Sequence, residues 1–256
     1  MSKVTVITGG TSGIGRGIVE KILANSAEDD LIFATYAHNA YKANEFWDNL
    51  KPEDQEKLII LKADMSFYDD MMNFVGEVKE KAGHVDWLIS NAGISTYDKF
   101  QDYTFEEWNK IVNTNLSVPV FMVKEFMPVM TEGGRVLFMG SYAGQQAYSS
   151  SLVYGVTKAA IHFLTKSLVK EFEPKGITVN AIAPGFFLTE QNRTLLTNPD
   201  GTYTQRGQDV IRQTPFGRMG RAEELCGTIQ YLISDAASFV TGTVAIVDGG
   251  FNAFAM

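Results

Sequence analysis

The chain has 256 residues, 45% of them hydrophobic, which is enough for one large α/β domain or two small domains. Its net charge is −8 and no basic cluster stands out, so the composition argues against a nucleic-acid-binding protein. The single cysteine, Cys226, excludes an internal disulfide framework and indicates a reducing compartment. No apolar run approaches the length of a membrane span, and a strand pattern begins at Val4, so we expect a cytoplasmic protein without a membrane segment.

Short β-branched and apolar runs alternate with longer helical patterns along the chain. The strand patterns fall at residues 4–8, 31–36, 57–62, 86–90, 135–140, 177–183 and 243–247. The helical patterns fall at residues 13–25, 40–50, 67–82, 105–129, 153–172 and 222–233. Most strand patterns are continuously apolar, as in strands that are covered on both faces. This order predicts a single-domain α/β fold, a doubly wound Rossmann-type parallel seven-stranded sheet with helices on both faces.

The first predicted strand leads into a glycine-rich loop, TGGTSGIG at residues 8–15. Glycines at such a turn let the backbone approach a pyrophosphate, and the helix that follows offers N–H groups and the positive end of its dipole. The spacing is GxxxGxG rather than GxGxxG, so a tight βα turn is the alternative, but the place in the first βαβ unit favours a dinucleotide. The candidate cofactor-binding residues here are Gly9, Thr11, Ser12, Gly13, Ile14 and Gly15.

The end of the second predicted strand should lie beside the adenosine ribose of a bound dinucleotide. Thr35, Tyr36 and Ala37 carry no charge there, and His38 and Lys42 follow closely. A carboxylate at this place would favour NAD, so its absence favours NADP, with NAD as the alternative.

The third predicted strand is followed by Asp64 and Met65. A carboxylate at this strand end could accept a hydrogen bond from the adenine amino group. The alternative is an N-cap of the helix that follows, near residues 64–66. The sequence leaves both interpretations open.

The segment from residue 186 to 220 interrupts the alternation of strands and helices. It has turn residues at 198–201 and joins the sheet at its carboxyl end, where ligands bind in doubly wound folds. A long excursion at this place predicts a lid over the substrate, and a surface insertion or an oligomer contact is the alternative.

Tyr154 is the only one of the ten tyrosines with a lysine, Lys158, at the fourth position after it. In the helical pattern around them, positions i and i+4 share a face. A nearby ammonium favours the ionised phenol, so the pair predicts an acid/base with a lowered pKa, and a bound nicotinamide would complete the effect. Ser141 follows another predicted strand and would hold the substrate oxygen. These groups predict hydride transfer between a nicotinamide and an alcohol or ketone, without a metal, because the histidines are scattered.

Several motifs together resemble the short-chain dehydrogenase/reductase family over essentially the whole chain. They are TGGTSGIG, NAG at 91–93, Asn115 in VNTNL, Ser141, YGVTK at 154–158, PGFFLT at 184–189 and VTGTVAIVDGG at 240–250. The resemblance implies a catalytic tetrad of Asn115, Ser141, Tyr154 and Lys158, in which Asn115 holds a water of a proton relay. It also implies cofactor contacts from Asn91, Ala92, Gly93, Tyr154, Lys158, Pro184, Gly185, Phe187 and Thr189.

The resemblance further implies a homotetramer, paired through the two long helices and through the last helix and strand. The chain departs from the family at Ser12, where NADP-using members often carry a basic residue, and at Ser90, where members often have a second asparagine. The first departure weighs against NADP.

The lid segment is similar to that of members acting on sugar acids, such as mannonate or gluconate oxidoreductases. The candidate substrate residues are Gln145, Tyr148, Gln191 and Arg193, which suit hydroxyls or a carboxylate. Apolar lid residues such as Phe186 and Leu195 instead favour a 3-oxoacyl or hydroxysteroid substrate. We therefore predict an NAD(P)-dependent oxidoreductase for a sugar acid or polyol, with a 3-oxoacyl or hydroxysteroid reductase as the second choice. A non-catalytic dinucleotide-binding sensor is the alternative of another class.

Overall fold

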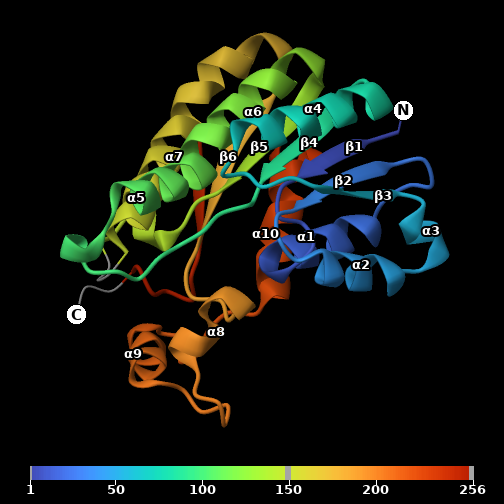
Figure 1. Cartoon of the computed structure of the whole chain (residues 1–256). Helices are drawn as coiled ribbons and strands as arrows, with labels where there is room; N and C mark the ends of the chain where they lie inside the picture. Colours follow the sequence, from blue (N-terminus) through green and yellow to red (C-terminus); the bar gives the residue numbers. More distant parts are fainter. Residues whose placement is uncertain (1, 148–150, 254–256) are drawn as a thin grey trace.

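The computed structural model describes residues 2–147 and 151–253, and within these ranges it contains one parallel sheet of seven strands. The strands are β1 (Val4–Ile7), β2 (Leu31–Tyr36), β3 (Leu58–Lys62), β4 (Val85–Ser90), β5 (Met130–Met139), β6 (Thr178–Pro184) and β7 (Val244–Val247). Their spatial order is β3-β2-β1-β4-β5-β6-β7, so the winding reverses between β1 and β4. The predicted doubly wound Rossmann-type sheet is confirmed (Figure 1).

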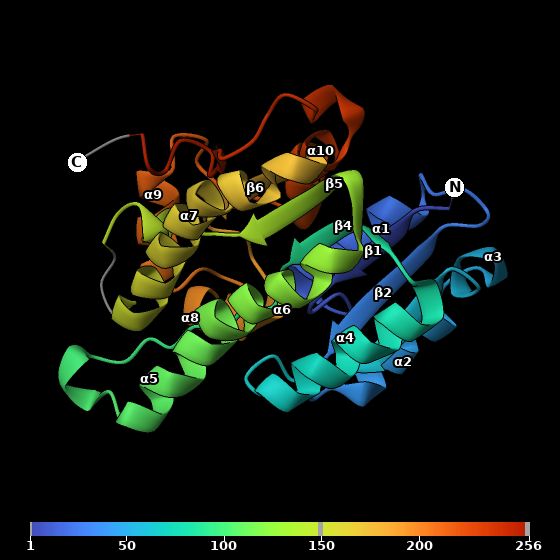
Figure 2. The same ribbon diagram turned by 90° about the horizontal axis from the view of Figure 1, so that it is seen from above.

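Helices cover both faces of this sheet (Figures 1 and 2). One face carries α1 (Gly13–Leu23), α2 (Ala40–Asp48) and α10 (Ala222–Ile233), and the other carries α4 (Tyr68–Ala82), α6 (Val118–Phe126) and α7 (Leu152–Phe172). Successive strand residues point to opposite faces, so Phe33 joins the apolar cluster under α4 and α6 while Ile32 joins the cluster under α1 and α10. This double burial explains why the strands read as continuous apolar runs. No helix among the described residues is long and apolar enough to cross a membrane.

One predicted helix and one predicted strand differ from the structure in their bounds. The single helix predicted over 105–129 is divided into α5 (Phe105–Val112), a π-helical turn (Asn113–Ser117) and α6. Strand β5 begins at Met130 rather than at residue 135, because Met130 pairs with Val85 before the register shifts. Short elements without a strong sequence pattern are α3 (Pro52–Gln55) and the 3₁₀ turns Phe100–Asp102, Met127–Val129, Tyr142–Gly144, Glu173–Lys175 and Asp235–Ala237.

The excursion between β6 and α10 contains two helices, α8 (Glu190–Leu196) and α9 (Gln205–Gln213). Both project beyond the carboxyl end of the sheet (Figure 1). They have their own apolar cluster, in which Leu196, Val210 and Met219 are buried. A bridge between Phe187 and Gly220 closes the base of the segment. The segment is therefore a small packed unit rather than an open loop.

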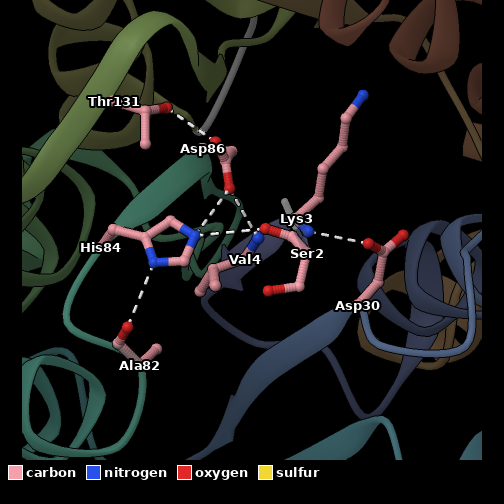
Figure 3. Close-up of polar contacts among 8 residues, drawn as sticks. All are labelled: Ser2, Lys3, Val4, Asp30, Ala82, His84, Asp86 and Thr131. Atoms are coloured by element: carbon pink, nitrogen blue, oxygen red, sulfur yellow. Dashed lines mark hydrogen bonds and ion pairs between the residues drawn. The ribbon is translucent and has the colours of Figure 1, made fainter.

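The amino ends of the strands are tied by a polar network around Asp86 (Figure 3). The Asp86 carboxylate accepts from the Val4 amide at 2.7 Å and from the Thr131 hydroxyl at 2.7 Å, and the His84 Nε2 lies 3.4 Å away. One side chain thus joins the starts of β1, β4 and β5. These contacts lie at the opposite end of the sheet from the site described next.

Candidate functional site

A cavity of about 610 Å³ opens where β1, β2, β4, β5 and β6 end. Every residue that the sequence predicts as a cofactor contact lines this cavity. They are Gly9, Thr11, Ser12, Gly13, Ile14, Gly15, Tyr36, Asp64, Met65, Asn91, Ala92, Gly93, Tyr154, Lys158, Pro184, Gly185, Phe187 and Thr189. The fold therefore brings segments that are far apart in the sequence into one wall, although their binding roles stay a prediction.

The glycine loop forms a cradle that side chains would fill. Gly9 and Gly13 have φ of 65° and 54°, a left-handed conformation that favours glycine. A Cβ on Gly15 would lie 2.0 Å from the Gly9 carbonyl oxygen, so no larger residue fits there. The Ser12 side chain makes no capping hydrogen bond at the start of α1 in the described part of the chain. A glycine turn without side chains, followed by a helix N-terminus without a side-chain cap, fits the pyrophosphate of a dinucleotide.

The loop after β4 is fastened to this cradle by Asn91. Its side-chain amide donates to the carbonyls of Thr8 at 2.9 Å and Gly9 at 3.1 Å. The Thr8 hydroxyl in turn accepts from the backbone amides of Asn91 and Ala92, at 3.0 and 2.9 Å. Asn91 therefore sets the distance between the ends of β1 and β4, where the winding of the sheet reverses.

The end of the cavity beside β2 contains two contacts between an acidic and a basic side chain. Asp64 lies 3.3 Å from the His38 Nε2, and Lys42 lies 2.5 Å from the Glu190 carboxylate at the start of α8. Asp64 also accepts from the Ser66 amide at 2.9 Å, a local turn ahead of α4. The N-cap interpretation of Asp64 is wrong, because the N-cap of α4 is Phe67, whose side chain makes no capping hydrogen bond. Asp64 lines the cavity instead, and its contact with adenine stays a prediction.

Tyr154, Lys158 and Ser141 come together in the cavity wall, the first two on α7 and Ser141 directly after β5. The Lys158 Nζ lies 5.5 Å from the centre of the Tyr154 ring and donates to the Met139 carbonyl at 2.6 Å. The lysine is only 4% exposed, and this burial lowers its pKa to about 8. Its ammonium is thus held by the strand end beside the phenol.

The prediction that the protein's own groups lower the pKa of Tyr154 is wrong. Burial raises the pKa of this phenol to about 12, a hydrogen bond with Ser141 lowers it only in part, and the neighbouring Tyr97 adds to the rise. Loss of water around the phenol outweighs its hydrogen bond with Ser141. A phenol with this pKa keeps its proton at neutral pH, which suits a proton donor.

Asn115 lies in the π-helical turn and is 2% exposed. Its side-chain oxygen accepts from the Ile94 amide at 2.9 Å, and its nitrogen donates to the Ile94 carbonyl at 2.8 Å and the Thr157 hydroxyl at 3.2 Å. It does not line the cavity itself. Asn115 therefore joins the π-helical turn to the loop after β4 and to α7. Its role in a water relay stays a prediction.

His162 is a neighbour of the site that sequence analysis missed. It lies one turn after Lys158 on α7, is buried, and its Nε2 accepts from the Ser141 amide at 3.4 Å. A Cβ on Gly140 would lie 2.3 Å from this ring, so the loop that carries Ser141 packs directly on the imidazole. Burial, then the positive charge of Lys158, lowers the pKa of His162 to about 4. The neutral ring can therefore act as an acceptor for the loop.

Two of the predicted substrate residues, Gln145 and Arg193, do not line the cavity. Gln145 is exposed and accepts from the Asn252 amide at 2.9 Å, and Arg193 is exposed on α8, so neither lines the wall. Gln191 belongs to α8, and Tyr148 lies outside the described residues.

Five further side chains that the sequence analysis did not name as substrate residues line the cavity. They are Tyr97, Tyr142, Phe186, Asn192 and Arg206. Tyr97 follows β4 in a stretch without regular structure, and Arg206 lies on α9, so no local motif marks either of them. Among the described side chains, His, Cys, Asp and Glu nowhere form a group of three that could hold a metal ion.

The chain matches known proteins over nearly its whole length. A family model described as enoyl-(acyl carrier protein) reductase matches residues 9–252. Acetoacetyl-CoA reductase of Rhizobium meliloti is 34% identical over 252 residues, which cover 98% of both proteins. The 3-oxoacyl-acyl-carrier-protein reductase FabG of Salmonella typhimurium is 32% identical over 250 residues, which cover 97% of this chain and 96% of the relative.

Solved structures share the architecture. The glucose/ribitol dehydrogenase of Brucella melitensis, a short-chain dehydrogenase/reductase, has a TM-score of 0.87 at 30% identity, over 97% of this chain and 96% of that one. A blue fluorescent protein from a metagenomic library, solved in complex with NADPH, has a TM-score of 0.87 at 25% identity, over 97% of both chains.

Proposed function

The chain belongs to the short-chain dehydrogenase/reductase family, and we propose that it reduces a 3-oxoacyl thioester to the 3-hydroxyacyl thioester with NADPH. It is an oxidoreductase that acts on CH–OH groups and the corresponding ketones, as its relatives are. The observation that carries the proposal is the meeting of Ser141, Tyr154 and Lys158 in the cavity that also contains the glycine cradle. The thioester is supported by the activities in the names of two full-length relatives.

Each of the three residues has a distinct role in this reaction. When bound, NADPH supplies the hydride that reduces the ketone carbon. Tyr154 gives its phenolic proton to the ketone oxygen, a role that its raised pKa favours at neutral pH. Ser141 donates a hydrogen bond to the same oxygen and stabilises the charge that develops there. Lys158 is charged below about pH 8 and stabilises the tyrosinate left after proton transfer.

The cofactor would be held by the cradle at its pyrophosphate and by the end of β2 at its adenosine. A 2′-phosphate would find the ammonium of Lys42 and the imidazole of His38 in the cavity lining and no carboxylate at position 36 or 37. This supports NADP over NAD, as does the solved relative that contains NADPH. The Glu190 carboxylate in the lining is already paired with Lys42, which limits its repulsion of a phosphate.

A sugar acid or polyol is the second candidate substrate. It is supported by Asn192 and Arg206 in the cavity wall and by the similarity to a glucose/ribitol dehydrogenase. A hydroxysteroid is favoured only by the aromatic wall of Tyr142 and Phe186. A dinucleotide-binding sensor is disfavoured because the Ser141, Tyr154 and Lys158 arrangement is intact.

The proposal includes a homotetramer and a lid. Large apolar side chains are exposed on the faces that the resemblance implies as interfaces: Phe105, Phe121 and Phe163 on the side of α5, α6 and α7, and Phe239 and Ile246 near β7. We expect light scattering to give a tetramer, and Phe163→Glu to give a smaller species.

The 186–220 segment would cover the substrate, since it contributes to the wall. A cytoplasmic location is part of the same proposal.

The test is a fluorescence titration with NADPH and NADH, followed by turnover of acetoacetyl-CoA and of a polyol and sugar-acid panel. We expect tighter binding of NADPH and the highest kcat/KM for the thioester. A higher kcat/KM for a sugar acid would move the second candidate to first place. Cofactor binding without turnover of any carbonyl or alcohol would favour the sensor and refute the proposal.

A further inference from the structure

Arg206 of helix α9 faces the cavity from the lid. It lines the wall together with Tyr97, and its guanidinium carbon lies 5.0 Å from the centre of the Tyr97 ring. Tyr97 is in turn near enough to Tyr154 to contribute to the raised pKa of that phenol. Arg206, Tyr97 and the proposed proton donor Tyr154 therefore line the same cavity.

The charge of the cavity lining differs from the charge of the whole chain. The chain has a net charge of −8, yet the charged residues in the lining are Lys42, Lys110, Lys158 and Arg206 against Asp64 and Glu190. Both carboxylates lie beside β2 and α8, in the pairs with His38 and Lys42. The other three cations belong to α5, α7 and α9, which lie on the side of the molecule away from α2 (Figure 2). An acidic protein that concentrates cations in its cavity attracts an anionic ligand.

The contact between Arg206 and the Tyr97 ring is compatible with binding of an oxyanion by the guanidinium. The Arg206 guanidinium carbon lies over the Tyr97 ring, and a cation–π contact does not itself use the N–H donors that bind a carboxylate or phosphate. The Arg206 Nε is shielded from water, and electrostatic interactions are stronger where water is excluded. The contact with the ring also restricts the side chain, which reduces the entropy lost on binding.

The orientation of α9 is set by close backbone packing. A Cβ on Gly207 would lie 2.3 Å from the Leu196 carbonyl oxygen, so α9 approaches the end of α8 more closely than a larger residue would allow. Val210 on the same helix is buried in the lid cluster. Because these contacts fix one face of α9, the neighbouring Arg206 is held toward the cavity.

We propose that Arg206, stacked on Tyr97, binds an oxyanion of the substrate, a carboxylate or a phosphate ester, and so selects anionic ketones. This inference rests on the proposed function, because it assigns substrate selection to the same cavity. It replaces the exposed Arg193 with a residue of the wall as the anion-binding arginine.

The test uses three substrates that share the 3-oxobutanoyl group: free acetoacetate, acetoacetyl-CoA and the uncharged N-acetylcysteamine thioester. Arg206→Gln should lower kcat/KM about 10–100-fold, mainly through KM, for at least one anionic substrate and less than about twofold for the uncharged one. Loss with acetoacetate identifies a carboxylate, and loss with acetoacetyl-CoA identifies a phosphate. Arg212→Gln is the matched control, since Arg212 lies on the same helix but pairs with Asp209 at the surface. It should change none of the three values.

Equal losses with all three substrates, or no loss with any, would overturn the inference. A second measurement does not depend on turnover: calorimetric binding of acetoacetate and of its methyl ester to the protein loaded with oxidised cofactor. If the site takes a carboxylate, the wild type should prefer the anion, and Arg206→Gln should lose that preference. A wild type that binds both equally refutes a carboxylate site, and the absence of a selective loss with acetoacetyl-CoA then refutes the anion site altogether. A wild type that binds the anion but reduces no ketone refutes the proposed function instead.

Discussion

Replacing His162 with glutamine should make the stability of the protein less dependent on pH. The imidazole is 8% exposed, and burial and the positive charge of Lys158 lower its pKa from 6.5 to about 4. Below pH 6.5 the unfolded chain takes up a proton that the folded chain refuses, so stability is lost as pH falls from about 6.5 to 4. The full effect is about 3 kcal/mol, of which about 2 kcal/mol is lost between pH 7 and 4.5.

The assay is urea unfolding of the wild type and His162→Gln at pH 7 and pH 4.5. Glutamine does not titrate, and its carbonyl can still accept from the Ser141 amide. Any cost of the substitution itself is present at both pH values and cancels, as do the contributions of distant carboxylates. The wild type should lose about 2 kcal/mol more than the variant on acidification. Equal losses would mean that the ring is not held neutral by its surroundings.

Three further predictions concern the cofactor and the site. Ala37→Asp should lower the preference for NADPH over NADH at least about tenfold in fluorescence titrations, because a carboxylate there repels a 2′-phosphate; an unchanged ratio would mean that the ribose lies elsewhere. Gly15→Ala should abolish NADPH binding and cost about 1–3 kcal/mol of stability, because its Cβ would meet the Gly9 oxygen, whereas Gly76→Ala, with open space around it, should cost nothing in chemical denaturation. The kcat/KM for ketone reduction should be level below pH 8 and fall above it, since Lys158 carries its charge only below its pKa of about 8; a rate that rises above pH 8 would contradict this role.

The sheet could be predicted from the sequence because strands buried on both faces leave a plain signal. Runs such as 31–36 are apolar at every position, and β2 occupies those residues. The start of β5 could not be predicted from the sequence, because glycines at 133 and 134 signal a turn. The pairing of Met130 with Val85 is a tertiary contact. The helices α8 and α9 were missed for a related reason. Most positions of QRGQDVIRQ are polar, so its small apolar face is recognisable only against α8.

The cofactor side of the site followed from motifs, whereas the substrate side did not. Glycines and strand ends have local signatures, so the predicted residues fall together in one wall. Arg193 and Arg206 are equally polar in the sequence, and the difference between them, that Arg206 lines the cavity and Arg193 does not, arises from tertiary packing such as that of Gly207 on α8. The pKa of Tyr154 could not be predicted from the sequence either. Its spacing from Lys158 was informative, but the pKa depends on burial, which the sequence does not quantify.

The most direct test of the central claim, that Tyr154 donates the proton, is the rate of ketone reduction by Tyr154→Phe at saturating NADPH. The variant lacks only the hydroxyl, so the rate should fall about 10²–10⁴-fold while the Kd for NADPH stays within about threefold of the wild type. A variant that keeps more than about a tenth of the wild-type rate would contradict the account.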